Sequence, residues 1–117
     1  MESLAVYRKT ARSRAQRTAQ ARHQRREKAW EAARKAASFL KARYGATRVV
    51  VFGSLTQADR FHLRSDIDLA AWGVRVDDYF DAVAKMLDIG GDIEINLVAA
   101  EKCRPYLLKA IEQGTEV

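Results

Sequence analysis

Residues 49–54 read VVVFGS, and after a gap of eleven residues, residues 66–72 read DIDLAAW. The first run is apolar and rich in β-branched residues, which predicts a strand over residues 48–52 that is covered on both faces. The second run alternates acidic and apolar residues before it becomes wholly apolar, which predicts another strand over residues 66–72. We expect Gly53 and Ser54, at the end of the first strand, to lie near the acidic start of the second.

Patterns typical of helices flank these strands. Residues 3–44 contain no Gly or Pro and are rich in Ala, Arg, Lys, Gln and Glu, which predicts one long helix. Residues 77–87 have apolar side chains at helical spacing, and Pro105 suits the first turn of a last helix. Residues 92–98 alternate again and predict a third strand. The expected fold class is α/β, a small mixed sheet flanked by helices, with a long basic N-terminal helix.

Charge is divided unevenly along the chain. Residues 1–48 hold 14 Lys and Arg against 3 Asp and Glu, a net charge of +11, whereas the remainder holds 7 against 12, or −5. Apolar residues recur at three- and four-residue steps from Trp30 to Tyr44, which predicts packing on the sheet. Before that stretch the apolar residues are mostly alanine, so we expect residues 1–28 to form a basic helical arm and residues 29–117 to form the folded domain. Such an arm suits an acidic protein surface or RNA.

Several classes of protein are disfavoured by the composition. Cys103 is the single cysteine and cannot form an internal disulfide, and the first residues lack the continuous apolar run of a signal peptide. The sequence contains no stretch of about eighteen apolar residues, the length needed to span a bilayer. We therefore expect a cytoplasmic protein without a membrane partner.

Asp66 and Asp68 are expected to extend from the same strand face, because side chains alternate along a strand. Repulsion between two carboxylates this close is about 1 kcal/mol in water and several times more in a cleft, so the pair needs a cation or a shared proton. Mg²⁺ is the expected cation because it prefers hard oxygen ligands. Gly53 and Ser54 are candidates for binding phosphate through backbone amides and the serine hydroxyl, and Arg64 is placed to meet a phosphate as well.

An apolar strand, Gly-Ser, about ten residues and then Asp-x-Asp on a second strand resemble the signature of the DNA-polymerase-beta-like nucleotidyltransferase superfamily. The short chain, the segment SDIDLAAWG and the C-terminal segment INLVAAEKCRPYLLKAIEQGTEV look most like its smallest branch, the MNT domains. The likeness covers residues 46–117 and includes the helix over residues 29–44. It implies a two-metal reaction in which Asp66 and Asp68 hold Mg²⁺ and the Gly53-Ser54 turn binds the triphosphate.

The resemblance also implies a partner. MNT proteins are often encoded beside HEPN-domain proteins, with which they pair as antitoxin and ribonuclease toxin, and members of the family adenylylate a tyrosine of the toxin. On this basis the chain is expected to be an antitoxin enzyme that transfers AMP from Mg·ATP to a tyrosine of its HEPN toxin. Nucleotidyltransferases that modify antibiotics or tRNA ends need a further substrate domain, for which this chain has no residues.

The chain departs from the family pattern at the third acid, which normally helps to deprotonate the nucleophile. The closest alignment puts Asn96 at that position, while Glu94 lies on the same strand face but about 6–7 Å away along the strand. Both side chains stay candidates for the third site group. An alternative function follows from Asn96, namely a catalytically weak antitoxin that neutralises its toxin by occlusion. A module that binds RNA through the arm is a further alternative.

Overall fold

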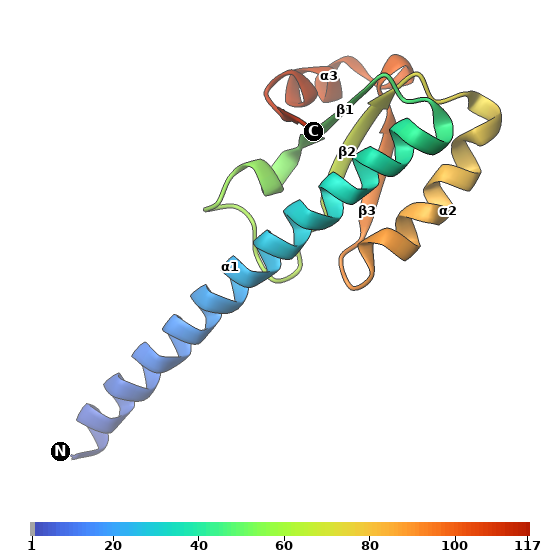
Figure 1. The fold of residues 1–117 in the computed structure, drawn as a ribbon. Coiled ribbons are helices and arrows are strands. Elements are labelled where there is room, and N and C mark those ends of the chain that lie inside the picture. Colours follow the sequence, from blue (N-terminus) through green and yellow to red (C-terminus); the bar gives the residue numbers. More distant parts are fainter. Residues whose placement is uncertain (1) are drawn as a thin grey trace.

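The computed structural model describes residues 2–117 and contains one four-stranded sheet with helices on both faces (Figure 1). The strand order is β3-β2-β1-β4. Strand β1 (Arg48–Phe52) pairs in antiparallel fashion with β2 (Ile67–Trp72) and with β4 (Thr115–Glu116), whereas β2 pairs in parallel with β3 (Ile95–Ala99). The sheet is therefore mixed, as predicted, and β1 and β2 occupy its centre.

Two separate hydrophobic cores lie on the two faces of the sheet. Helices α1 (Glu2–Tyr44) and α2 (Tyr79–Gly90) cover one face, and α3 (Pro105–Glu112) covers part of the other. Because side chains alternate along a strand, Val49 of β1 joins the core beneath α1 and α2, while Val50 joins the core beneath α3. The prediction that the valine run is buried on both faces is confirmed.

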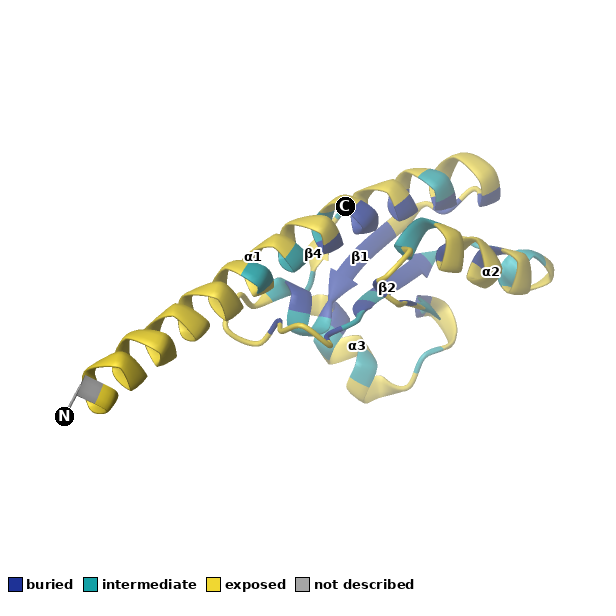
Figure 2. Ribbon diagram, turned by 90° about the horizontal axis from the view of Figure 1, so that it is seen from below, coloured by how far each residue is buried: buried dark blue, intermediate teal, exposed yellow. Residues whose placement is uncertain are grey.

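Helix α1 is one long helix, as predicted; it runs without interruption over 43 residues, and its two halves differ in burial. All described side chains over residues 3–20 are exposed, whereas the second half packs on the sheet (Figure 2). The buried side chains of α1 are those of Ala29, Ala32, Ala33, Ala36, Ala37, Leu40 and Tyr44. The molecule is consequently elongated, with a longest dimension of 66 Å. No described helix, α1 included, has the length and apolar character that a membrane span requires.

Strand β3 begins at Ile95, three residues later than predicted. Helix α2 continues to Gly90, and Gly91 then adopts a positive φ of 58°. The amide of Ile93 donates to the carbonyl of Gly90 at 3.0 Å, so Asp92 and Ile93 belong to a turn. Ile93 is nevertheless buried, which is why the alternating pattern extends beyond the strand itself.

Strand β4 and two of the three 3₁₀ helices were not predicted, because two or three residues are too few to show a periodic pattern. Strand β4 adds Thr115 and Glu116 to the edge of β1, and the amide of Val117 donates to the carbonyl of Val49 at 3.0 Å. Three short 3₁₀ helices within the described part of the chain connect the larger elements: η1 (Gly53–Thr56), η2 (Val76–Asp78) and η3 (Ala100–Lys102).

Candidate active site

The end of β1 lies beside the start of β2, because the two strands are antiparallel and Phe52 pairs with Asp68. Gly53, the next residue, has a φ of 78°, and a Cβ atom added to it would lie 2.4 Å from Oδ2 of Asp68. The Asp68 carboxylate therefore packs against Gly53 in a space that a larger residue would fill. The structure thus brings the Gly-Ser turn into contact with the second aspartate of the Asp-x-Asp pair.

The Gly-Ser turn continues into η1 and is fixed by its own hydrogen bonds. The Thr56 hydroxyl donates to the carbonyl of Gly53 at 2.7 Å, and the amide of Gln57 donates to the carbonyl of Ser54 at 3.0 Å. Ser54 is half-buried, and its hydroxyl has no hydrogen-bond partner among the described residues. That hydroxyl is free to bind a ligand.

The charges of Asp66 and Asp68 interact at the start of β2. Asp66 directly precedes the strand, Asp68 lies within it, and both are partly buried. Burial raises the pKa of Asp68, a hydrogen bond from Asn96 opposes this rise, and the charge of Asp66 adds to it. The ionised form of Asp68 is thus disfavoured at this position, which is the condition that a bound cation relieves.

Of the two candidates for the third site group, Asn96 lies beside Asp68 and Glu94 does not. The parallel register of β2 and β3 pairs Asn96 with Asp68, and Nδ2 of Asn96 donates to Oδ1 of Asp68 at 3.4 Å. Glu94 precedes β3, is exposed, and contributes its backbone carbonyl to the amide of Ile67 at 2.9 Å. In residues 2–117 no three His, Cys, Asp or Glu side chains are grouped closely enough to hold a metal ion. The carboxylate pair is therefore supplemented by a neutral amide.

Arg64 lies in the loop that leads to Asp66, and its side chain is exposed. The loop is closed by Ser65, whose hydroxyl accepts a hydrogen bond from the amide of His62 at 2.9 Å. The guanidinium of Arg64 makes no hydrogen bond or ion pair with any residue that the structure describes. The structure therefore places Arg64 two residues before Asp66 in the chain without a polar contact to either aspartate.

Two arginines that fall within the expected arm hold the loops of this site, a role that the sequence analysis missed. Arg25 Nη2 donates to the carbonyl of Ser65 at 2.9 Å, next to Asp66 in the chain. Arg26 donates to the carbonyl of Leu55 in η1 through Nε at 3.2 Å and Nη2 at 3.0 Å. In a segment with basic residues on every side, nothing local distinguishes these two from their neighbours.

Comparison with known proteins identifies the fold. No family model matches the sequence, and no curated protein matches it. Among solved structures, a toxin–antitoxin with AMP-PNP has a TM-score of 0.59 at 20% identity, over 71% of this chain and 69% of that chain. The toxin–antitoxin MntA–HepT has a TM-score of 0.56 at 16% identity, over 74% and 69%. A candidate minimal nucleotidyltransferase has a TM-score of 0.57 at 26% identity, over 74% and 89%. The chain has the nucleotidyltransferase fold.

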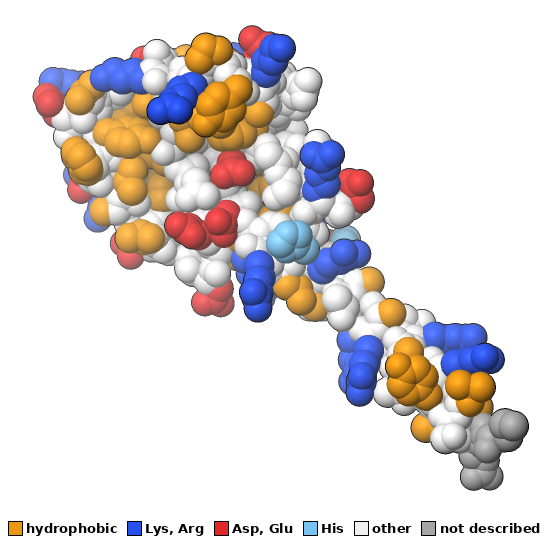
Figure 3. Space-filling model, turned by 180° about the vertical axis from the view of Figure 1, so that it is seen from behind, with side chains coloured by type: hydrophobic (Ala, Val, Ile, Leu, Met, Phe, Trp, Pro, Cys, Tyr) orange, Lys and Arg blue, Asp and Glu red, His pale blue; other side chains and the backbone are white. Residues whose placement is uncertain are grey.

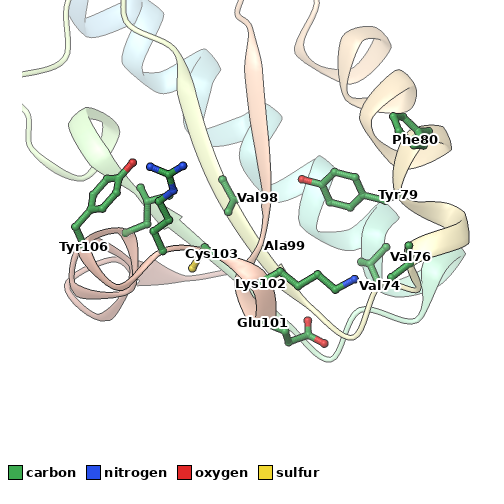
Figure 4. A pocket seen from close by; sticks show the side chains of 12 residues that line it. Val74, Val76, Tyr79, Phe80, Val98, Ala99, Glu101, Lys102, Cys103 and Tyr106 are labelled. Carbon is green, nitrogen blue, oxygen red and sulfur yellow. The ribbon is translucent and has the colours of Figure 1, made fainter.

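Within this nucleotidyltransferase fold, the site adjoins a pocket on the same face of the sheet. Val98 follows Asn96 by two residues and therefore shares its strand face, about 6–7 Å along β3. Val98 lines a pocket of about 410 Å³, and Tyr79 and Tyr106 lie on opposite sides of it (Figure 4). The polar side chains of Lys102 and Arg104 also line this pocket, which is otherwise mostly apolar.

The face of the molecule seen in Figure 3 shows where side chains of each type gather. Hydrophobic side chains form a broad area on the domain beside a smaller group of acidic ones, while basic side chains lie along the arm and around the edge of the domain (Figure 3). Much of the exposed apolar surface belongs to η2 and α2, where Val76 is 62%, Phe80 86% and Leu87 68% exposed. Apolar side chains this exposed are typical of an interaction surface.

Proposed function

We propose that this protein is an antitoxin nucleotidyltransferase that transfers AMP from Mg·ATP to a tyrosine of a cognate HEPN toxin and thereby neutralises it. The observation that carries the proposal is the packing of the Asp68 carboxylate against Gly53, on a nucleotidyltransferase fold. A phosphate-binding turn in contact with a metal-binding carboxylate is what transfer from a nucleoside triphosphate requires. Further support comes from the toxin–antitoxin structures with this fold, one of them with AMP-PNP.

Asp66 and Asp68 are the proposed magnesium ligands. The donor set fits this ion, since both carboxylates supply hard oxygens and a half-turn of the Asn96 amide would present its oxygen in place of Nδ2. Bound Mg²⁺ would neutralise phosphate charge and lower the pKa of the attacking hydroxyl. The backbone amides of Gly53 and Ser54, together with the Ser54 hydroxyl, would hold the phosphates that leave as pyrophosphate.

The toxin would approach over β3. In-line transfer requires the acceptor to enter opposite the leaving pyrophosphate. If the Gly53-Ser54 turn at the end of β1 holds the pyrophosphate, the opposite side lies across β2, toward Asn96 and the pocket that Val98 and Tyr106 line. The exposed apolar side chains of α2 supply a docking surface for the toxin nearby.

A second candidate function is neutralisation by occlusion, without transfer. Asn96 favours it, because an amide cannot accept the proton of the attacking tyrosine as a carboxylate can. In that case the site would bind nucleotide and the complex would form, but the toxin would stay unmodified.

One experiment separates the two functions. The purified protein is incubated with Mg²⁺, a candidate HEPN toxin, and ATP that is labelled at either the α- or the γ-phosphate. Adenylyl transfer puts label on a toxin tyrosine from α-labelled ATP alone, and mass spectrometry identifies the residue. A stable complex without label supports occlusion, and the absence of both complex and label refutes both functions.

A further inference from the structure

The proposed transfer makes no use of the projecting part of α1, residues 3–24, which we call the projecting arm. Between Glu2 and Glu27 the chain has eight Lys and Arg and no Asp or Glu. Six of these basic residues belong to the projecting arm, and all six are exposed: Arg8, Lys9, Arg12, Arg14, Arg17 and Arg22. A surface of this charge fits a polyanion.

The basic side chains surround the projecting arm and do not form one face. With 3.6 residues in each helical turn, Arg8 and Arg17 lie about 180° apart, and Lys9 and Arg14 about 140° apart. A flat protein partner contacts a single stripe of a helix and would leave half of these charges without a partner. A polyanion that lines both sides of a groove can meet all of them.

The protein itself does not neutralise these charges. Arg8 and Arg12 are four residues apart, and Arg14 and Arg17 are three apart, which are spacings at which like charges repel on a helix. Within the projecting arm, side-chain hydrogen bonds run from Thr10 to the carbonyl of Val6 and from Arg17 to the carbonyl of Ser13, and neither involves an acid. Phosphate groups would remove this repulsion.

The dimensions of the grooves indicate which nucleic acid the projecting arm can bind. An α-helix with its side chains is about 10–12 Å wide, and the major groove of B-form DNA, about 12 Å wide, admits it. The major groove of A-form RNA is deep and narrow, and single strands are bound largely by aromatic stacking, for which the projecting arm offers two side chains, Tyr7 near its tip and His23 at its base. We propose that the projecting arm binds in the major groove of double-stranded DNA.

Salt dependence of binding tests this proposal directly. The full-length protein is titrated into a fluorescent 20-base-pair DNA duplex, and anisotropy gives the binding constant at several salt concentrations. Replacing Arg8, Arg12 and Arg17 together by Gln should lower the slope of log K against log salt by about 2.7, since each lost phosphate contact contributes about 0.9. Gln is a good helix former and these positions are exposed, so far-UV circular dichroism should stay unchanged.

A matched control removes the same charge from the domain. Arg75, Lys85 and Lys109 are exposed and lie outside the projecting arm, so their replacement by Gln should leave the slope unchanged. Equal slopes for the two triple variants would show that the effect comes from net charge alone and would overturn the proposal. So would tighter binding of an RNA duplex of the same sequence, or no binding to DNA at 50 mM salt. Label transfer to the toxin is measured separately, so failure of the proposed function would not affect this test.

Discussion

Beneath α1 and α2 the three longer strands present apolar side chains, such as Val49, Leu69 and Ile95, whereas the opposite face of the sheet, which α3 covers in part, presents Asp68 and Asn96. The difference follows from coverage, because α3 has 8 residues and lies over only part of its face. On the covered face the three longer strands have no polar side chain to desolvate, while the other face keeps the partly buried Asp68 and the exposed Asn96 open to ligands. Stability and function should therefore respond to substitutions on different faces.

The largest expected effect is on the open face. Replacing Asp66 and Asp68 together by Asn should lower the rate of adenylyl transfer by about 1000-fold or more, because the proposed ligands for Mg²⁺ lose their charge. The rate of adenylyl transfer is measured as the initial rate of label incorporation from α-labelled ATP. Asp77 and Asp88 replaced together by Asn form the control, since both are exposed acids of the same domain. Transfer within tenfold of the original rate would exclude the open face as the active site.

On the covered face, Leu40→Ala should lower the free energy of unfolding by about 3 kcal/mol, since it leaves a cavity in a closed core. Leu40 is 0% exposed, whereas Leu4 on the same helix is 52% exposed, so Leu4→Ala should change stability little. Urea denaturation measures both. Each folded molecule of Leu40→Ala should transfer AMP at the original rate, and a loss of rate without loss of stability would contradict the division between the faces.

The exposed apolar side chains of α2 should affect the toxin complex and not the nucleotide. Replacing Phe80 and Leu87 together by Glu should weaken toxin binding by about 10- to 100-fold through burial of unpaired charge. Isothermal titration calorimetry measures the affinity for the toxin and the affinity for the nucleotide. Lys85→Glu is the control, because it changes the net charge equally and lies outside the apolar stripe. An unchanged toxin affinity in the double variant would move the interface elsewhere.

Arg26 connects the two faces, because it lies on α1 and binds the turn of the open face. Arg26→Met should lower transfer about tenfold, mainly through a higher KM for ATP, since η1 loses both hydrogen bonds to Leu55. Arg26→Lys restores one donor and should recover part of the loss. Arg22→Met, one helical turn away and exposed, should leave the KM unchanged. Equal effects of the two Met variants would argue against a positioning role.

The smallest effect is a gain of stability on the open face. Burial raises the pKa of Asp68 in the folded protein above its unfolded value, so the charged form reduces stability at neutral pH. Asp68→Asn should therefore raise the melting temperature at pH 7, and the difference should vanish below pH about 3.9, where the carboxyl is protonated in both states. Thermal unfolding at pH 7 and pH 3 measures it. A lower melting temperature at pH 7 would show that Asp68 stabilises the fold.

Local patterns were sufficient to predict the helices, the three longer strands and the approach of the Gly-Ser turn to Asp68. Features that depend on how distant segments pack were not predictable. The choice between Glu94 and Asn96 follows from the register of a parallel strand pair, which the sequence of β3 does not specify. The contacts of Arg25 and Arg26 depend on where α1 crosses the sheet. The pocket at Val98 draws its lining from several elements and has no signature in any of them.

The continuity of α1 sets a fixed distance within the molecule. From Ser3 to Arg25 the helix has no Gly or Pro, and at 1.5 Å per residue it spans about 33 Å. A flexible linker lets two bound molecules take many separations, whereas a helix holds them at one separation and one angle. A molecule bound at the tip of α1 is therefore held at a fixed distance and in a fixed direction from the loop that leads to Asp66.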